Sequence, residues 1–319
     1  MTYRCAFLGC GPRSNGHAAA YEYIDRGTMV ACCDLNESRL NAYGERYGIA
    51  GRYTQLDEML AKEEPDVVHL VTPPTLRVEL MTQLSAAGVP GVIVEKPICI
   101  GASDYKALRD LEQKTQTRFV VNHQLRHHLK IVEFLRDVAE GKIGQVLFID
   151  AYAVLPMSGQ GVHVLDLIFA FSGYAPKAFG VGEPCEQVET VFGASSGYDD
   201  INGTHPSPRT AETLITFKNG IRAALQAGEG APMLDNSAPN WGHKRIAVYG
   251  THGFRHWWMQ GCEKALPDGT IEKLAHDYAT EDLWGQAGLT NSLFDWLEDE
   301  SKISPTNLRT ALDEWLVIL

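Results

Sequence analysis

The segment YRCAFLGCGPRS, residues 3–14, decides the fold that we expect of this chain. The apolar run Tyr3–Leu8 has the length and composition of a buried β-strand, and a glycine turn, residues 9–11, follows it directly. Glycine is needed where such a turn is tight and where the backbone approaches the pyrophosphate of a dinucleotide. The amides at the start of the next helix then bind the pyrophosphate. The segment therefore predicts a strand, a phosphate-binding turn and a helix.

Ser14 stands where the dinucleotide-binding pattern has its third glycine. Serine is small enough for close packing of helix on strand, and it can cap the helix. Two glycines alone are a weak signal, because an ordinary strand-to-helix turn can contain them. Asp34 strengthens the signal, since it ends the second predicted strand, where an acidic side chain accepts hydrogen bonds from the adenosine ribose. The cofactor residues expected in these two segments are Gly9, Gly11, Pro12, Arg13, Ser14 and Asp34.

The same aspartate favours NAD over NADP, because a carboxylate at this position repels a 2′-phosphate. The following Leu35-Asn36 offers no adjacent arginine that could bind such a phosphate. Arg39 lies a few residues further on and leaves NADP open as the less favoured cofactor.

The first 123 residues alternate between apolar strand-like runs and helix-compatible stretches. The runs show little polar alternation, which is typical of a parallel sheet covered on both faces. Ligands of such sheets bind at the carboxyl ends of the strands. The expected strands are Tyr3–Leu8, Thr28–Cys33, Asp66–Val71, Gly91–Val94 and Arg118–Val121. We therefore expect an α/β Rossmann domain over residues 1–123.

Residues 124–319 have a different pattern and predict a second, α+β domain with a large open, mostly antiparallel sheet. Helices are expected near 129–140 and 162–171, and a long strand over 144–154. Strand-like runs then follow one another without helices, and Asn219-Gly220 predicts a hairpin. Segments 183–208 and 228–242 are rich in turn-forming residues and are expected to be loops. The C-terminal helices are expected either in this domain or packed back on the first.

The composition limits the classes of partner. The chain has 319 residues and a formal net charge of −12, which disfavours nucleic acid and anionic membrane surfaces. No apolar run has the length of a membrane-spanning helix, and the first strand begins too early for a signal peptide. The seven cysteines form no C-x-x-C pair, which suggests free thiols in a reducing compartment. We therefore expect a cytoplasmic protein.

A second motif, Val94-Glu95-Lys96-Pro97, follows another buried strand. A lysine at the carboxyl edge of a sheet is partly desolvated and can hydrogen-bond a substrate hydroxyl or carbonyl near a nicotinamide. An ordinary surface lysine at the start of a loop would give the same local sequence. The spacing alone does not decide between these two interpretations.

Taken in order along the chain, these motifs resemble the glucose–fructose oxidoreductase / inositol dehydrogenase / MocA family. The resemblance includes the glycine turn with His17, the segment 72–74, the Glu95-Lys96-Pro97 motif, Gly144-Gln145-Val146 and His163-x-x-Asp166. It covers nearly the whole chain. It implies oxidation or reduction of sugars, cyclitols or related polyols, and a homodimer or homotetramer assembled through the second-domain sheet.

The resemblance also implies roles for individual residues. Lys96 is implied to be the catalytic lysine that contacts substrate, and His163 the acid/base histidine. By itself His163 would be interpreted as a buried core histidine. Further cofactor contacts are implied for Thr72, Pro73, Pro74, Glu95 and Lys96. Substrate contacts are implied for His163, His123 and Arg126, and Trp241 could stack on a sugar ring.

Three features depart from the family pattern. Many members have an aspartate four residues before the histidine, where this chain has Gly159. The loop that precedes His163 is short. The family's Thr-Pro-Asn-x-x-His pattern becomes Thr72-Pro73-Pro74-x-x-Arg77. The first two departures concern the substrate pocket.

Other histidines give no metal prediction. His123, His127 and His128 cluster after the last Rossmann strand, and such clusters are usually solvated surface rather than convergent ligands. We expect no metal.

The leading hypothesis is an NAD-dependent oxidoreductase that transfers hydride between a secondary alcohol of a sugar, cyclitol or glycoside and the nicotinamide. Two alternatives remain open at this point. One is a hydrolase or lyase that uses NAD transiently during glycoside cleavage. The other is a non-catalytic dinucleotide sensor with the same fold.

Overall fold

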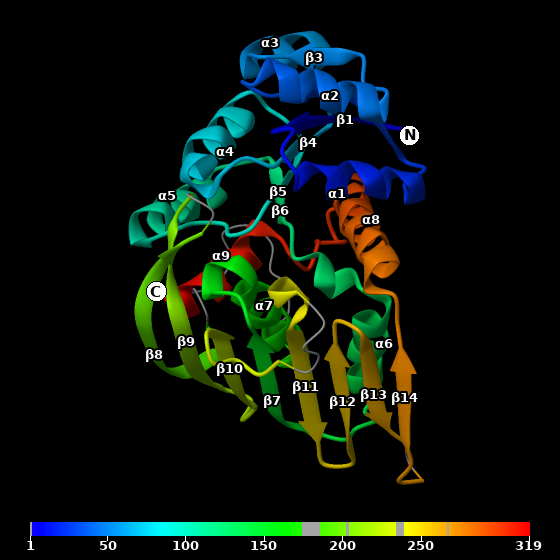
Figure 1. The fold of residues 1–319 in the computed structure, drawn as a ribbon, viewed down its shortest axis with the longest axis vertical. Coiled ribbons are helices and arrows are strands. Elements are labelled where there is room, and N and C mark those ends of the chain that lie inside the picture. Colours follow the sequence, from blue (N-terminus) through cyan, green and yellow to red (C-terminus); the bar gives the residue numbers. More distant parts are fainter. Residues whose placement is uncertain (1, 174–185, 202–203, 234–238, 267) are drawn as a thin grey trace. The chain divides into compact units, whose positions relative to one another are not determined.

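The computed structural model describes residues 2–173, 186–201, 204–233, 239–266 and 268–319, and Figure 1 shows their arrangement. The chain forms two compact units. The first contains residues 2–124 and 283–312, and the second contains the described part of 125–282 together with 313–319.

The first unit is built on a six-stranded parallel sheet with the strand order β3-β2-β1-β4-β5-β6. This is the strand order of a dinucleotide-binding Rossmann fold, so the predicted fold class is confirmed. The expected strands are present, and the short β3 was not anticipated. The strands are β1 (Tyr3–Leu8), β2 (Gly27–Cys33), β3 (Gly51–Tyr53), β4 (Val67–Leu70), β5 (Gly91–Val94) and β6 (Arg118–Val121).

Helices connect these strands, and part of the C-terminal region completes the unit. From residue 283 onward, α8 (Tyr278–Glu298) packs its apolar side chains against the sheet, where Phe294 stacks on Tyr3 with ring centroids 4.3 Å apart. Arg26 holds the same helix through ion pairs of 2.7 Å to Asp295 and 2.9 Å to Glu298. The connecting helices are α1 (Ser14–Ala19), α2 (Glu37–Tyr47), α3 (Leu56–Glu63), α4 (Arg77–Ala86) and α5 (Ala102–Glu112).

The second unit contains an eight-stranded sheet with the order β14-β13-β12-β11-β7-β10-β9-β8. Within this second sheet, β7–β10 is the only parallel pairing among its described strands, so the expected mostly antiparallel sheet is confirmed. The strands are β7 (Val146–Ala153), β8 (Val188–Asp200), β9 (Pro206–Phe217), β10 (Arg222–Gly228), β11 (Lys244–Gly250), β12 (Gly253–Trp258), β13 (Gly261–Ala265) and β14 (Ile271–Ala275).

Two helices, α6 (Leu129–Ala139) and α7 (Val162–Phe171), contribute to the core of the second unit. Nine of the ten residues of α7 are buried, since its sequence is apolar on nearly every side. The last helix, α9 (Leu308–Ile318), begins in the first unit and ends in the second.

The predicted loop over residues 183–208 was wrong where the chain is described. Val188–Asp200 forms β8, the longest strand of the sheet, and β9 begins at Pro206. Its glycine and serine residues signal turns, but an antiparallel partner supplies the backbone hydrogen bonds along its length. The hairpin at Asn219-Gly220 is confirmed, with Gly220 at φ +86° between β9 and β10.

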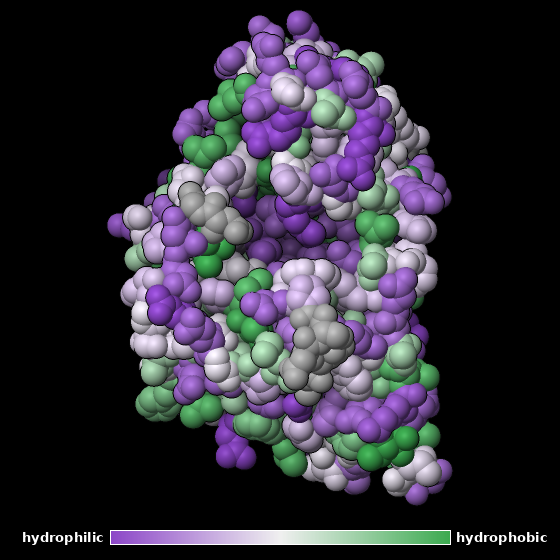
Figure 2. Space-filling model, in the orientation of Figure 1, coloured by the Kyte–Doolittle hydropathy of each residue, from purple (hydrophilic) through white to green (hydrophobic). Residues whose placement is uncertain are grey.

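The surface of the first unit is mostly hydrophilic in the view of Figure 2. Within the described ranges, no helix combines the length and apolarity that a membrane crossing requires.

Candidate active site

Four strands of the first unit deliver the expected cofactor residues to one edge of the sheet. Gly9 follows the carboxyl end of β1, Asp34 follows β2, Thr72 lies two residues after β4, and Glu95-Lys96 follows β5. All of these strands are parallel, so their carboxyl ends meet at the same edge. β1 lies between β2 and β4, where the strand order reverses, and this is the usual dinucleotide position.

The glycine turn has the local geometry that a pyrophosphate requires. Gly9 has φ +96°, and a Cβ at this position would collide with the carbonyl oxygen of Val71. By contrast, a Cβ on Gly11 would meet no atom within 4 Å. Packing within the protein therefore explains Gly9 but not Gly11, whose open surroundings fit close approach of a phosphate group.

Asp34 is held in place beside this turn. Its Oδ2 accepts a 2.9 Å hydrogen bond from the Cys10 amide, and its Oδ1 accepts one of 2.9 Å from the Asn36 amide. Arg39 forms a forked ion pair with the same carboxylate, with Nε 3.1 Å from Oδ2 and a terminal nitrogen 3.1 Å from Oδ1. Arg39, which kept NADP open as the less favoured cofactor, is therefore paired with Asp34 in this structure.

Ser14 does not cap α1, contrary to expectation. The helix has no side-chain hydrogen bond at its N-cap, and the fully buried Ser14 Oγ is 2.8 Å from the Tyr43 hydroxyl of α2. Tyr43 in turn donates a 3.0 Å hydrogen bond to the Ser14 carbonyl oxygen. Serine at this third position therefore serves helix–helix packing.

Glu95 is the centre of a buried polar cluster. Its Oε1 accepts hydrogen bonds from Arg13 Nε at 2.6 Å, His17 Nε2 at 2.9 Å and Asn122 Nδ2 at 2.7 Å. Burial alone would raise the pKa of this carboxyl group. The charge of Arg13, the hydrogen bond from His17 and the nearby Lys96 outweigh burial and hold the pKa well below its usual range.

A chain of hydrogen bonds continues from this cluster to a residue that sequence reasoning missed. His17 Nδ1 lies 3.0 Å from His69 Nδ1, and His69 Nε2 lies 2.8 Å from the Tyr21 hydroxyl. His69 is fully buried in the middle of β4 and stacks on Phe7 with ring centroids 4.6 Å apart. A histidine inside an otherwise apolar strand was the available signal, because a buried polar group needs a partner.

Lys96 lies next to Glu95 and is partly buried. Burial lowers the pKa of its amine to about 8, and the charges of Arg13 and Arg77 lower it as well, while Glu95 opposes them. A lysine with this pKa exists in both protonation states near neutral pH, as a general acid/base requires.

The segment after β4 carries the third departure from the family pattern. Pro74 is buried, Pro73 is exposed, and the Thr72 hydroxyl is buried without a hydrogen-bond partner among the described residues. Arg77 is 1% exposed, and burial lowers its pKa to about 10. This chain therefore places a buried cation near Glu95 and Lys96, where the family pattern has a histidine.

His163, in the second unit, is 3% exposed on α7. A π-helical turn, Met157–Gly161, leads into that helix and contains Gly159. A Cβ at Gly159 would meet only the Leu155 Cβ, at 3.9 Å. Packing therefore does not explain why this chain lacks the family's aspartate.

The same π-helical turn carries a serine–histidine pair that sequence reasoning also missed. Ser158 Oγ is 2.9 Å from His205 Nε2, and His205 Nδ1 is 2.8 Å from the Thr204 hydroxyl. Thr204 donates to the Ile201 carbonyl, so it accepts from Nδ1, and Nε2 is left to accept from Ser158. Ser158 and His205 are each 5% exposed. No local motif signals this pair, because 47 positions separate its members.

Of the residues expected to contact substrate, Arg126 has internal partners. Its guanidinium forks onto Asp166, with the shortest contact at 2.7 Å, and also lies 3.4 Å from Glu314 Oε1. His123 is 4% exposed, whereas Trp241 is 51% exposed. Among these residues, Trp241 has an open surface that a sugar ring could stack on.

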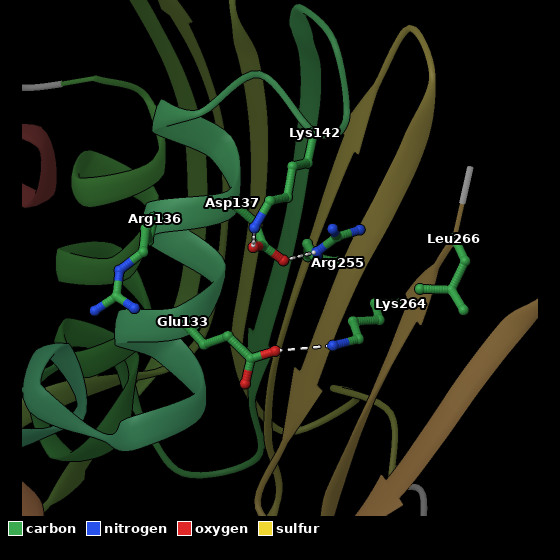
Figure 3. Close-up of a pocket in the computed structure, with 7 residues that line it drawn as sticks. All are labelled: Glu133, Arg136, Asp137, Lys142, Arg255, Lys264 and Leu266. Carbon is green, nitrogen blue, oxygen red and sulfur yellow. Dashed lines mark hydrogen bonds and ion pairs between the residues drawn. The ribbon is translucent and has the colours of Figure 1, made fainter.

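A pocket in the second unit, shown in Figure 3, is lined by charged side chains of α6, β12 and β13. Arg255 and Lys142 both pair with Asp137, at 2.7 and 2.8 Å, and Lys264 pairs with Glu133 at 2.9 Å. The ion pairs of Arg255 and Lys264 join α6 to the sheet, the pair of Lys142 joins α6 to the turn that follows it, and we assign all three a structural role. No group of three or more potential metal ligands occurs within the described ranges.

Comparison with known proteins agrees with this geometry. Residues 3–123 match the model of an oxidoreductase family with an NAD-binding Rossmann fold. A D-apiose dehydrogenase of Paraburkholderia graminis is 29% identical over 242 residues, which cover 70% of this chain and 60% of that protein. A myo-inositol 2-dehydrogenase of Thermotoga maritima is 24% identical over 258 residues, covering 78% and 73% of the two chains.

Solved structures share the whole fold. An oxidoreductase from Agrobacterium radiobacter, in complex with NAD+, L-tartaric acid and magnesium, superposes with a TM-score of 0.79 at 18% identity, covering 100% of this chain and 94% of that one. The strand order, the glycine turn, the Glu95-Lys96-Pro97 motif and these similarities agree. Residues 3–123 match the NAD-binding Rossmann domain of the glucose–fructose oxidoreductase / inositol dehydrogenase / MocA family of oxidoreductases, and the chain is similar to members of that family over most of its length.

Proposed function

We propose that this protein is an NAD-dependent dehydrogenase that oxidises a secondary alcohol of a sugar, cyclitol or glycoside. The observation that carries the proposal is Lys96, a lysine with a pKa of about 8 at the edge of the sheet where the glycine turn also lies. The names of the relatives, D-apiose and myo-inositol dehydrogenase, support polyols as the substrate class.

The proposed cofactor residues are those at the carboxyl edge of the first sheet. Gly9 permits the tight turn, Gly11 leaves room for the pyrophosphate, and Asp34 is the proposed acceptor for the ribose hydroxyls. Bound NAD supplies a hydride acceptor. The remaining cofactor contacts are assigned to Pro12, Arg13, Ser14, Thr72, Pro73, Pro74, Glu95 and Lys96.

In this proposal Lys96 accepts the proton of the substrate hydroxyl at Nζ as the alcohol is oxidised. Its amine is mostly protonated below about pH 8 and mostly neutral above it. Oxidation needs the neutral amine, so the oxidation rate increases as the pH rises through about 8, and the rate of ketone reduction shows the opposite dependence. His163 is the proposed second acid/base group, and His123, Arg126 and Trp241 are proposed substrate contacts.

Replacing Lys96 tests the assignment. Lys96→Ala is expected to lower the oxidation rate by about 10²–10⁴-fold, because a general base is lost. Affinity for NAD, measured by fluorescence titration, should remain within a few-fold of the wild type. The assay follows NADH absorbance over a panel of sugars and cyclitols, with exposed Lys62→Ala as the control. Near-wild-type rates in Lys96→Ala would show that another residue is the base.

Gly159→Asp tests the departure beside His163. A Cβ at Gly159 meets no close contact, so the variant is expected to fold with nearly unchanged thermal stability. If the wild-type chain lacks a substrate-orienting carboxylate, the variant should lower KM for polyols by several-fold at similar kcat. An unchanged KM would indicate that Gly159 is not the position where the carboxylate acts.

We also propose a cytoplasmic homo-oligomer, a dimer or tetramer assembled through the second sheet. Large apolar side chains are exposed there, including Phe192 at 70%, Leu214 at 58% and Leu147 at 45%. Phe192 and Leu214 line an open groove on the sheet. The described cysteines are free and buried, as expected in a reducing compartment. Sedimentation of wild type and Phe192→Asp measures the oligomer, and an unchanged mass would refute this interface.

A further inference from the structure

The hydrogen-bond chain behind Glu95 has a definite donor order. Glu95 is ionised, because its pKa lies well below its usual range, and an ionised carboxylate only accepts hydrogen bonds. His17 Nε2, 2.9 Å from Glu95 Oε1, must therefore carry a hydrogen. Asn122 Nδ2 lies 3.1 Å from the same nitrogen because both groups donate to one oxygen.

Two complete bonding patterns satisfy the rest of the chain. When His17 is neutral, its Nδ1 accepts from His69 Nδ1–H, and His69 Nε2 accepts from the Tyr21 hydroxyl. When His17 gains a proton, its Nδ1–H donates to His69 Nδ1, and His69 Nε2–H donates to the Tyr21 oxygen. The bond from His17 Nε2 to Glu95 is present in both patterns.

His69 makes both patterns possible. Its two ring nitrogens exchange the roles of donor and acceptor, and the Tyr21 hydroxyl can serve either role. Burial lowers the pKa of His69 well below its usual value, and the nearby His17 lowers it further, so His69 itself stays uncharged. The ring cannot rotate freely because it stacks on Phe7 with an interplanar angle of 5°.

We infer that His69, supported by Tyr21, is a positioning residue: it keeps His17 Nε2–H directed at Glu95 in either charge state and so holds the Glu95 carboxylate beside Lys96. The inference rests on the proposed function for its catalytic meaning, since Lys96 is the proposed base. His69 acts on Lys96 only through His17 and Glu95.

The charges around Lys96 predict how it responds when this arrangement is loosened. Glu95 raises the pKa of Lys96, whereas burial, Arg13 and Arg77 lower it. A carboxylate that moves away from Lys96 therefore lowers its pKa below about 8. Tyr21 ends this series of hydrogen bonds, and the titratable groups Cys5 and Tyr43 lie near its hydroxyl.

The test measures Lys96 directly in the whole protein without cofactor or substrate. Trace acetylation with isotopically labelled acetic anhydride between pH 6 and 10, followed by mass spectrometry of peptides, gives the apparent pKa of each lysine. The exposed Lys62 and Lys218 serve as internal references in the same digest.

His69→Phe keeps a ring stacked on Phe7 and removes both nitrogens. The apparent pKa of Lys96 should fall by about half a unit or more, because His17, a donor to Glu95, loses the partner that keeps its Nε2–H directed at the carboxylate. His69→Asn, whose amide can donate to or accept from His17, should restore a value close to that of the wild type. Arg77→Met should shift the pKa in the opposite direction, upward, since Arg77 lowers it.

Tyr21→Phe is the milder variant and remains informative if His69→Phe does not fold. It should lower the Lys96 pKa by less than His69→Phe does. Tyr53→Phe, which removes a tyrosine–carboxylate hydrogen bond of 2.6 Å elsewhere in the same unit, should leave it unchanged. The inference is overturned if folded His69→Phe keeps the wild-type pKa, or if His69→Asn shifts it as much as His69→Phe.

Nitrogen-15 NMR of the histidine rings gives an independent measurement. His17 Nε2 should carry a hydrogen at every pH at which the protein is folded and Glu95 is ionised, and a bare Nε2 would overturn the inference. Neither measurement involves turnover. A failed dehydrogenase assay therefore leaves this test intact, and a failed titration leaves the proposed function standing.

Discussion

Two buried glutamates, Glu95 in the first unit and Glu314 in the second, both lie beside an arginine, yet their pKa values shift in opposite directions. Burial would raise both. At Glu95 the effect of burial is outweighed by the charges of Arg13 and Lys96 and by the hydrogen bond from His17. The pKa of Glu95 therefore falls well below its usual range. At Glu314 burial is reinforced by Asp166, which Arg126 offsets only in part, and the pKa rises well above it.

The difference comes from how each arginine is shared. Arg13 Nε gives Glu95 a 2.6 Å hydrogen bond, and two further donors bind the same oxygen. Arg126 places its shorter contacts, 2.7 to 3.2 Å, on Asp166 and reaches Glu314 only at 3.4 Å. One guanidinium thus neutralises one carboxylate, and a second buried carboxyl group keeps its proton. The Glu95 cluster lies beside Lys96, the proposed base. The Glu314 cluster connects α7 to the C-terminal end of the chain.

Replacing Arg126, which contacts both Asp166 and Glu314, should have the largest effect on stability. Arg126→Gln leaves Asp166 as a buried charge without its counter-ion and should lower the free energy of unfolding by about 3–5 kcal/mol. Urea denaturation measures this loss. Arg136→Gln, an exposed arginine in the same unit, should change stability by less than about 0.5 kcal/mol. Equal losses in the two variants would contradict the assigned role of Arg126.

Glu95→Gln should have an intermediate effect and lower the free energy of unfolding by about 1–2 kcal/mol at pH 7. The loss is limited because Arg13 is partly exposed, so water solvates its charge when the carboxylate is removed. The folded-state pKa of Glu95 is depressed, so its contribution is complete above the unfolded pKa of about 4.3 and is lost as the pH falls through the folded value. The variant should lack this acid-dependent loss. Exposed Glu22→Gln is the matched control, and its profile should follow the wild type.

Glu314→Gln should have the smallest effect and the opposite sign. The folded-state pKa is raised, so the folded protein keeps a proton that the unfolded chain releases above about pH 4.3, and stability falls as the pH rises toward the folded value. The amide removes that penalty and should stabilise the protein at pH 7 by roughly 1 kcal/mol. Exposed Glu189→Gln controls for the change of net charge. A loss of stability in Glu314→Gln would mean that the carboxylate is ionised and bound.

Much of the fold could be predicted because local pattern and burial agree along the first unit. The strands β1, β5 and β6 begin and end where the apolar runs do. β3 was missed because three residues are too few to show an alternating hydrophobic pattern. β8 was mistaken for a loop because pairing with β9, rather than its own composition, keeps it extended.

The candidate site was predictable only in part. Glycine at residue 9 follows from a positive φ, which a turn motif encodes, whereas the collision of a Cβ with Val71 is a contact with a distant segment that the motif does not encode. The internal partners of Arg126, which are Asp166 and Glu314, could not be predicted. That outcome depends on a partner 188 positions away, which no local pattern indicates.

By itself the sequence determined the parallel strand–helix alternation, the glycine turn and the position of Lys96, because these depend on residue type over short stretches. Only the tertiary structure decided the charge of each buried group. The pKa of Lys96 and the bonds to Glu95 depend on burial and on partners far along the chain, with Arg13 82 positions and His17 78 positions from Glu95. Desolvation and the distances between charges exist only after the chain has folded.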